Sequence, residues 1–433
     1  MNSASGAGIT TNPHALDAIV KASATHTIVA SQDIVDVRGV KLWARGQPIS
    51  AELQQRLLER KLQHPMEACL QTEGGATLFT LVDDLRSLLE SDNPLASVLK
   101  PWSSLLVDQA KQLPLHAVAQ LLLTAAMATR PNSMPHAVMG MALSGAMVAS
   151  RNLPLAEIRL AMLGGLLHDI GEVYIQPQYL DYATALDTLG HKHLMVHPRV
   201  AEMLLNTTTD YPKTLTRGIG EHHERLDRSG YPARLNSDQI STLGRVLMVM
   251  EVALGILRAP KAPLTRISFA LRVVPGEFDP AWTGFLCDAA RRAREIPPVD
   301  AAGTPRDAGP LERLDAQLAE TRELAVALQR QRGSAAVMHI VEEAMTRLDR
   351  LRVAWNALGL WGLPQTELRS SEQFELALAG SELEQRLRGL QRECLLLSEN
   401  LGDTEKLQLS PLWAGLQLNA PSGTAPPPTP PVA

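Results

Sequence analysis

The stretch "GGLLHDIGEVYIQP", residues 164–177, places an adjacent histidine and aspartate where an apolar run ends. The run, residues 155–167, has the length and composition of a buried helix, and Gly171 interrupts it just after His168 and Asp169. Glu172 adds a second carboxylate to the same turn. Because imidazole and carboxylate groups are metal ligands, the His-Asp pair is a candidate for half of a metal site, although two residues alone also recur by chance.

The composition indicates a mainly α-helical globular protein. The chain has 433 residues, of which 45% are hydrophobic and only 4% aromatic, and leucine and alanine dominate it. This balance favours helices over a β-sandwich or barrel. The formal net charge of −5 provides no basic surface of the kind that binds a nucleic-acid polymer. We therefore expect no nucleic-acid polymer as a partner.

The cysteines and the apolar segments indicate a cytoplasmic protein. Cys69, Cys287 and Cys394 are far apart and lack CxxC spacing, so neither a disulfide framework nor a thiolate zinc site is predicted. No window reaches the roughly 18 uninterrupted apolar residues of a membrane span, and the N-terminus lacks a signal-peptide pattern. We expect reduced thiols and no membrane span.

The domain organisation follows from changes in composition along the chain. The stretch "DIVDVRGVKLWARGQPIS", residues 33–50, alternates apolar and polar residues around two glycines, which predicts short strands. Most later segments have the periodicity of amphipathic helices. The predicted parts are a flexible N-terminus (1–25), a small β-containing module (26–76), a helical domain (77–296), a linker (297–310), a C-terminal helical region (311–418) and a disordered Pro-rich tail (419–433).

Leucines in the C-terminal region approximate the a and d positions of a coiled coil. The seam consists of Leu311, Leu314, Leu318, Ala325 and Leu328. It lasts for fewer than the three or four heptads that make a coiled coil convincing. Two interpretations stay open, namely self-association or binding of a protein partner through this seam, and packing of the helices on a core of their own.

Histidines concentrate in the middle of the chain. Seven of the twelve lie between residues 136 and 223, on separate predicted helices. Helix bundles build metal sites by projecting imidazoles and carboxylates inward from several helices. The candidates are His136, His168 with Asp169, His197, His222 and His223. Such ligands suit iron, manganese, zinc or nickel, a carboxylate can bridge two ions, and two bridged ions suit phosphodiester hydrolysis.

The segment "EHHERLDRSGYP", residues 221–232, resembles the HD-GYP family, a branch of the HD phosphohydrolase superfamily that hydrolyses the bacterial messenger cyclic di-GMP. The stretches "LLHDIGE" (166–172), "MVHPRVAEMLL" (195–205) and "GRVLMVMEVALGIL" (244–257) are similar to further motifs of the family, in the same order. The resemblance covers roughly residues 110–296. It implies an HD-type helical bundle, here with a small N-terminal β element and a C-terminal helical or coiled-coil region.

The resemblance also implies roles for individual residues. Asp169 would bridge two divalent ions, iron or manganese, and is the residue expected to be catalytic. Glu251 occupies the position at which the family has its last aspartate. The implied metal ligands are His136, His168, Asp169, His197, His222, His223 and Glu251. The implied substrate-binding residues are Tyr231, Arg258 and Lys261.

Three positions depart from the family pattern. Asn132 stands where many members have a glutamate, which argues against a third metal, and Arg228 replaces a glycine of a tight turn, which predicts a reshaped loop. Glu172 replaces a lysine that can contact the scissile phosphate. Losing one such electrostatic contact typically costs about 3 kcal/mol, or a hundredfold in rate. We therefore expect Glu172→Lys to raise turnover.

Two classes of function follow. The first is a metal-dependent phosphodiesterase that hydrolyses cyclic di-GMP to the linear dinucleotide or GMP in bacterial signalling. The second, which Glu172 and Arg228 favour, is a catalytically degenerate HD-GYP module that acts as a nucleotide-sensing or protein-interaction scaffold. Another cyclic dinucleotide or a nucleotide monophosphate stays open as the substrate, because ligand spacing carries no information about pocket shape.

Overall fold

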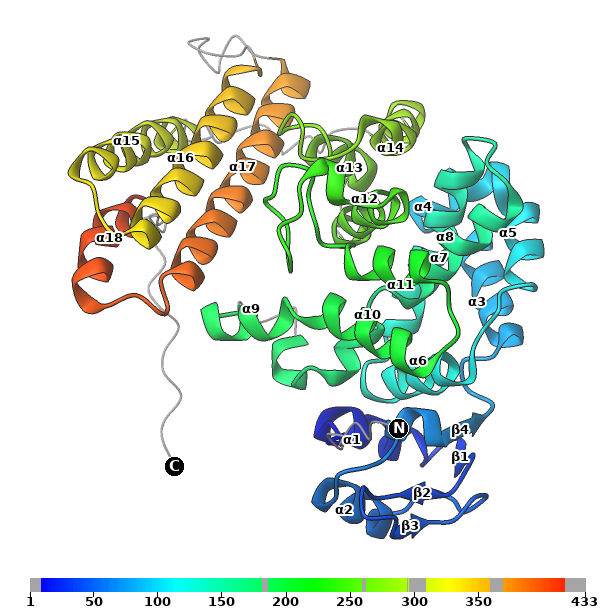
Figure 1. Cartoon of the computed structure of the whole chain (residues 1–433). Helices are drawn as coiled ribbons and strands as arrows, with labels where there is room; N and C mark the ends of the chain where they lie inside the picture. Colours follow the sequence, from blue (N-terminus) through cyan, green and yellow to red (C-terminus); the bar gives the residue numbers. More distant parts are fainter. Residues whose placement is uncertain are drawn as a thin grey trace, which may run out of the picture. The chain divides into compact units, whose positions relative to one another are not determined.

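The computed structural model describes residues 9–180, 186–258, 262–293, 295, 309–358 and 369–416, and its secondary structure is mainly α-helical (Figure 1). The chain divides into two compact units, the first comprising residues 1–272 and 276–296, and the second comprising 273–275 and 297–433. The predicted β module and all of the predicted helical domain except residues 273–275 thus fall in one unit. Most of the predicted linker and all of the predicted tail lie outside the described residues.

The N-terminal segment contains a helix, so the prediction of a flexible segment over residues 1–25 is wrong for Pro13–Ala22 (α1). The side-chain oxygen of Asn12 accepts hydrogen bonds from the backbone N–H groups of His14 and Ala15, and Pro13 occupies the first helical position. Leu16 and Ile19 are fully buried. The helical spacing of these apolar residues is short and lies among Ser- and Thr-rich flanks, which obscured it in the sequence.

Short strands follow α1, as the alternating pattern predicted. The elements of this module are β1 (Thr27–Ala30), β2 (Ile34–Val35), β3 (Lys41–Trp43), α2 (Ala51–Glu59), η1 (Met66–Cys69) and β4 (Leu70–Glu73). The strands form two antiparallel pairs, β1 with β4 and β2 with β3. In the first pair the register runs from Thr27 opposite Glu73 to Ala30 opposite Leu70.

The rest of the first unit is a bundle of helices. Its α-helices are α3 (Leu78–Glu90), α4 (Pro94–Leu99), α5 (Ser103–Ala110), α6 (Ala117–Thr129), α7 (Ser133–Ala149), α8 (Leu155–Leu167), α9 (Thr188–Leu194), α10 (His197–Thr208), α11 (Lys213–Gly220), α12 (Thr242–Leu257), α13 (Pro263–Ala270) and α14 (Pro280–Ala293). Short 3₁₀ helices connect them: η2 (Lys100–Trp102), η3 (Ile170–Tyr174), η4 (Pro177–Leu180) and η5 (Ser237–Gln239).

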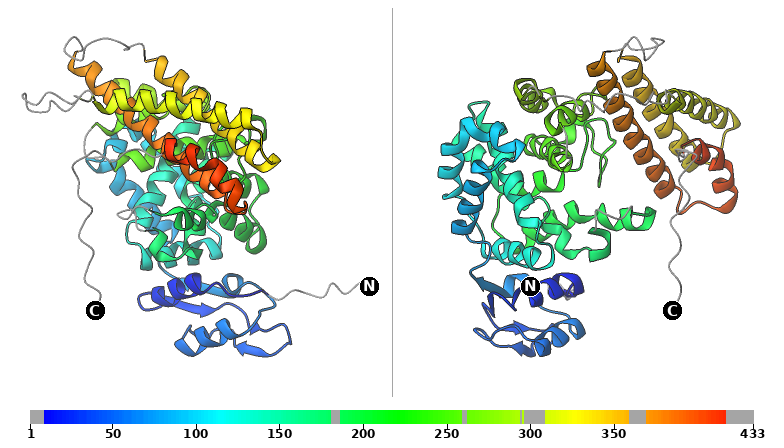
Figure 2. Two further views of the ribbon diagram at one scale, coloured as in Figure 1. Left: turned by 90° about the vertical axis from the view of Figure 1, so that its left-hand side faces the viewer. Right: turned by 180° about the vertical axis from the view of Figure 1, so that it is seen from behind.

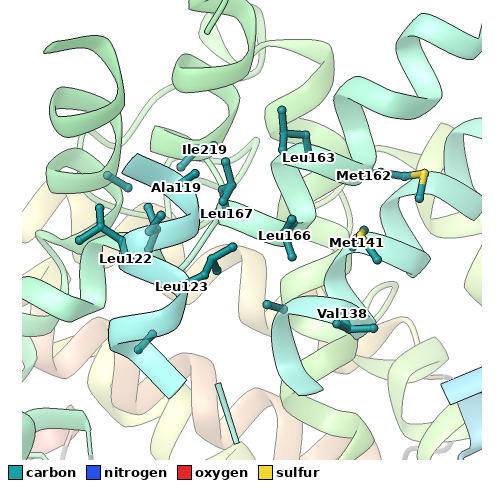
Figure 3. Packing of buried hydrophobic residues seen from close by; sticks show 14 of the residues in the cluster. Ala119, Leu122, Leu123, Val138, Met141, Met162, Leu163, Leu166, Leu167 and Ile219 are labelled. Carbon is teal, nitrogen blue, oxygen red and sulfur yellow. The ribbon is translucent and has the colours of Figure 1, made fainter. Parts of the chain in front are cut away.

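The core of this bundle is centred on α7 and α8. Both helices are apolar on nearly every face, so neighbouring helices cover them on several sides. Figure 3 shows Val138 and Met141 of α7 beside Leu163 and Leu166 of α8, with leucines of α6 and Ile219 of α11 nearby.

Small residues let the central helices approach each other closely. A Cβ atom at Gly140 of α7 would lie only 2.6 Å from the carbonyl oxygen of Gly165 in α8. Likewise, a Cβ atom at Gly171 would overlap the carbonyl oxygen of His197 at the start of α10. Because His136 lies one turn before Gly140 and His168 lies one turn after Gly165, these contacts bring histidine-bearing segments together.

The second unit contains a four-helix bundle, seen from two further sides in Figure 2. Its helices are α15 (Gly309–Gln331), α16 (Ala335–Asn356), α17 (Ser370–Leu397) and α18 (Asp403–Leu416). Contacts join α15 to α16, α16 to α17, α17 to α18 and α18 back to α15. The seam residues Leu314, Leu318, Ala325 and Leu328 are buried. They are used inside the chain's own bundle, in line with the intramolecular interpretation.

Across the described part of the chain, no helix combines the length and the apolar character that crossing a membrane requires.

Candidate metal centre

Side chains from five segments of the first unit converge on one centre. His136 comes from α7, His168 and Asp169 from the junction of α8 and η3, His197 from the first residue of α10, and Glu251 from α12. His222 and His223 follow the end of α11. The structure therefore brings together every residue that the family resemblance implies as a metal ligand.

The ligand atoms form two groups that share Asp169. One group contains His136, His168, Asp169 and Glu251, and the other contains Asp169, His197, His222 and His223. In each group the candidate ligand atoms all lie within 4.8 Å of one another.

The two oxygens of Asp169 face different groups. Its Oδ2 atom lies 3.3 Å from His136 Nε2 and 3.2 Å from His168 Nε2. Its Oδ1 atom lies 3.4 Å from His197 Nε2 and 3.6 Å from His222 Nε2. A carboxylate in this position can ligate one cation with each oxygen, which is the geometry of a bridging ligand.

Backbone carbonyls orient three of the imidazoles in the same way. The Nδ1 atoms of His168, His197 and His222 lie 2.9, 2.8 and 2.6 Å from the carbonyl oxygens of Gly165, Leu194 and Ile219, three residues earlier in each case. A carbonyl oxygen only accepts, so each Nδ1 carries the proton and a neutral ring presents a lone pair at Nε2. Such an outer hydrogen bond is the usual way in which proteins orient a metal-binding histidine.

The two carboxylates of the centre are held in the ionised form that binds metals. Burial acts to raise the pKa of the Asp169 carboxyl, but the surrounding imidazoles, His168 foremost, hold this pKa well below its usual range. Burial opposes ionisation of Glu251 too, yet contacts with His168 bring its pKa to about 2. The Oε2 atom of Glu251 is buried and lies 3.2 Å from His168 Nε2 and 3.8 Å from His136 Nε2. A buried carboxylate oxygen in that position fits a metal ligand.

Burial and the neighbouring charges shift the pKa values of the imidazoles in different directions. Burial lowers the pKa of His168, but Asp169 and Glu251 outweigh it and the pKa lies well above the usual value. Burial also lowers the pKa of His222, and burial together with the nearby His222 lowers that of His223 further. His222 and His223 are thus neutral at pH 7, which is the form that binds metals.

The predicted substrate-binding residues lie at the edge of this centre. Tyr231 stacks on His223 with ring centroids 4.5 Å apart. Arg258 places its Nη2 atom 3.5 Å from His136 Nδ1. Lys261 lies outside the described residues. Asn132 belongs to neither ligand group, although it lines a neighbouring cavity.

Arg228 adopts the conformation that glycine favours. Its φ is +69°, and its backbone N–H donates a hydrogen bond to the carbonyl of Arg225 at 3.1 Å. The left-handed turn thus exists despite the arginine, at a conformational cost of about 1–2 kcal/mol. Replacement of the glycine alone therefore does not prevent this turn from forming.

Glu172 is paired with a cation, which changes the expectation that it adds an uncompensated charge. Its Oε2 atom forms an ion pair with Nη1 of Arg130, the residue that ends α6. Burial and the nearby Asp169 raise the pKa of Glu172, whereas Arg130 lowers it. Sequence reasoning missed Arg130 because it is 42 positions from Glu172. The only signal available was an arginine six residues before the first candidate ligand.

A cavity of about 660 Å³ opens beside the first ligand group. Its lining includes His136 and Asp169 of the centre and the cation-bearing residues Arg130 and Arg258. This volume is within the range of small-molecule binding sites.

The N-terminal module contacts the segment that carries Asp169. Asn12 donates a hydrogen bond from Nδ2 to the carbonyl oxygen of Tyr174 at 3.2 Å, and the Tyr174 hydroxyl donates to Glu67 Oε1 at 2.6 Å. Glu67 and the body of Tyr174 are shielded from solvent, and burial raises the pKa of both groups. These contacts join the N-terminal module to η3, the segment that follows Asp169.

Comparison with known proteins agrees with the fold and the motifs. Residues 117–263 match the family model described as HD domain. This range contains all of the candidate ligands from His136 to Glu251. No solved structure matches the chain.

Three curated relatives are named as phosphodiesterases. A 3'3'-cGAMP-specific phosphodiesterase of Vibrio cholerae is 36% identical over 87 residues, covering 20% of this chain and 19% of the relative. A cyclic di-GMP phosphodiesterase of Pseudomonas aeruginosa is 29% identical over 196 residues, or 45% of each chain. Another 3'3'-cGAMP-specific phosphodiesterase of Vibrio cholerae is 34% identical over 102 residues, covering 23% of this chain and 20% of the relative. The chain thus spans less than half the length of each relative.

Residues 117–263 therefore have an HD-type helical fold, and the three matching relatives are named as cyclic dinucleotide phosphodiesterases.

Proposed function

We propose that this chain is a metal-dependent phosphodiesterase that hydrolyses cyclic dinucleotides. The observation that carries the proposal is the position of Asp169, whose two oxygens each face a separate group of imidazoles. Imidazole and carboxylate ligands suit iron or manganese, and we propose two such ions with Asp169 as the bridge. When bound, two such ions would supply an activated water and stabilise the charge that develops on a phosphoryl group.

The protein's own residues bind and orient the substrate. Tyr231, stacked on His223, offers an aromatic surface next to the second ligand group. Arg258, close to His136, is a donor for a phosphate oxygen. The cavity beside the first ligand group provides room for the rest of the molecule. Two divalent ions held by two carboxylates and neutral imidazoles leave a net positive charge, which attracts a phosphodiester anion.

The choice among cyclic dinucleotides is the finer part of the proposal. We propose cyclic di-GMP as the substrate, with the linear dinucleotide or GMP as products. The Pseudomonas aeruginosa relative, which shares the longest of the three aligned segments, is named for this substrate. The two Vibrio cholerae relatives are named for 3'3'-cGAMP, so both compounds belong in the test.

The Arg130–Glu172 ion pair weakens the alternative of a degenerate scaffold. That alternative was favoured by Glu172 and Arg228. Glu172 has a guanidinium partner, and Arg228 forms the left-handed turn that a glycine would form. Binding of a protein partner through the C-terminal helices stays a prediction. The described seam residues do not support it, because they are buried within their own bundle.

The test combines metal content with turnover. The full-length protein, purified without oxygen and supplied with iron or manganese, should hold about two ions per chain and convert cyclic di-GMP faster than 3'3'-cGAMP. Asp169→Asn keeps the size of the side chain but weakens the bridge, and should remove metal and lower the rate on the order of a thousandfold. The matched control is His339→Ala in the C-terminal bundle, which should change neither. Metal binding without conversion of either compound would refute the proposed phosphodiesterase activity and favour the catalytically degenerate scaffold.

A further inference from the structure

The ion pair between Arg130 and Glu172 forms part of the wall of the substrate cavity. Glu172 is nearly inaccessible to solvent, whereas 22% of the Arg130 side chain is exposed. Both residues line the cavity of about 660 Å³ that also contains His136 and Asp169. Both side chains thus border the space that a ligand would enter, and the guanidinium is the more exposed of the two.

The Arg130–Glu172 pair also borders a second cavity. Arg130 and Glu172 also line a smaller cavity, of about 240 Å³, together with His14 and Asp17 of α1. The pair thus lies between the metal centre and the N-terminal module. The position of Arg130 is set by the end of α6, after which Pro131 cannot continue the helical hydrogen bonding.

A buried carboxylate is costly unless a cation is paired with it, so Glu172 favours a single position for the Arg130 guanidinium. A guanidinium has five N–H donors that point to different edges of a plane, and it can contact a carboxylate and a phosphate together. Its fork matches the oxygens of a phosphodiester better than an ammonium group does.

We propose that Arg130 contacts a phosphate of the cyclic dinucleotide and that Glu172 acts through Arg130 as a positioning residue. This inference rests on the proposed function and makes it more specific. Arg130 and Arg258 then provide a cation from each of two helix ends, α6 and α12, for a substrate with two phosphates. The carboxylate at position 172 supports substrate binding, so the effect of Glu172→Lys is opposite to the one expected from the sequence.

The experiment is a steady-state comparison in the full-length, metal-loaded protein. Arg130→Met keeps the length of the side chain but removes its charge and its donors. It should raise the KM for cyclic di-GMP by about 10- to 100-fold, the effect of losing one or two charge-assisted hydrogen bonds. The kcat and the metal content should change little, because Arg130 is in neither ligand group. Arg130→Lys should recover part of the loss.

Two further variants test the role of Glu172. Glu172→Lys puts two cations together and should raise the KM instead of raising turnover, whereas Glu172→Gln keeps a hydrogen-bond acceptor for Arg130 and should have a smaller effect. The control is Arg245→Met. Arg245 forms a partly buried ion pair with Asp279 at 2.8 Å and does not line the cavity.

The outcomes separate the two proposals. If the wild-type protein converts no cyclic dinucleotide, the proposed function fails and this inference fails with it. If the wild-type protein is active but Arg130→Met has the same KM as Arg245→Met, only this inference is overturned. Faster turnover by Glu172→Lys would also overturn it. A merely structural role for Arg130 would lower metal content or thermal stability without a selective rise in KM that lysine partly reverses.

Discussion

Two regions of this chain are built from helices alone, yet they bury different groups. In the HD domain, α7 and α8 are apolar on nearly every face and bring histidines into the interior, where His168 and His222 are fully buried. In the C-terminal bundle, each helix contributes a stripe of buried aliphatic residues. The described residues of that bundle contain no histidine–carboxylate cluster. The presence of buried histidines next to carboxylates, rather than helical structure as such, distinguishes the region that can hold metal.

Gly140→Ala should have the largest effect, because it tests whether metal binding requires the close packing of α7 against α8. The added Cβ would lie 2.6 Å from the Gly165 carbonyl oxygen and 3.2 Å from Met250 Sδ, so α7 and α8 must separate. We expect a loss of about 3 kcal/mol or more in the free energy of unfolding, because backbone cannot yield as a side chain does. Separation of the helices also moves His136 away from His168, so bound metal should fall. Denaturant titration and metal analysis measure the two effects, and normal metal content would refute the link.

Leu387→Ala is the corresponding change in the C-terminal bundle. Leu387 of α17 is fully buried, and its truncation should cost about 3 kcal/mol in the stability of that bundle. Metal content should not change, because every candidate ligand belongs to the first unit. Loss of metal in this variant would show that the two regions are not independent in the way that we expect.

The two regions should also differ in how their stability depends on pH, because their carboxylates have different partners. In the C-terminal bundle Glu393 is paired with Arg347, whereas in the first unit Glu67 accepts a hydrogen bond from Tyr174. Burial raises the pKa of Glu67 above its ordinary value of 4.5. At a pH between 4.5 and the raised pKa of the folded protein, Glu67 holds a proton in the folded state that it has lost in the unfolded chain. Stability should therefore fall as pH rises through this window, by up to about 1.4 kcal/mol per unit.

Glu67→Gln removes this titration while it keeps an oxygen acceptor for Tyr174. The variant should lack the part of the pH dependence that begins near pH 4.5, and it should be at least as stable as the wild type at pH 7. Urea unfolding of both proteins from pH 5 to 8 measures the difference. Parallel curves for the two proteins would mean that Glu67 does not titrate in this range.

Much of the candidate site could be predicted from the sequence because the residues occur in short local motifs. His168 with Asp169 and His222 with His223 are adjacent in the chain, and the HD and Gly-Tyr-Pro segments mark them. Arg130 could not be found in this way. Its partner Glu172 is distant in sequence, and only the packing of α6 against η3 brings the two together.

The same distinction applies to the fold. The strands were predictable from alternation, and the C-terminal leucines were predictable as a buried seam. However, periodicity identifies the apolar face of a helix and does not identify the surface that covers it. For Leu314 and Leu318 that surface is formed by helices of the same chain. The helix α1 was missed because its apolar positions are few and its flanks are typical of a frayed terminus.

The hydrogen bonds of Tyr174 affect the choice of a fragment for laboratory work. A fragment that begins at residue 117, where the family model begins, would keep every candidate ligand. It would also delete Asn12 and Glu67, which bond to the backbone and side chain of Tyr174, and expose the apolar face of α6 that packs against α1. The smallest piece that carries the motifs is therefore smaller than the smallest piece that buries its own core.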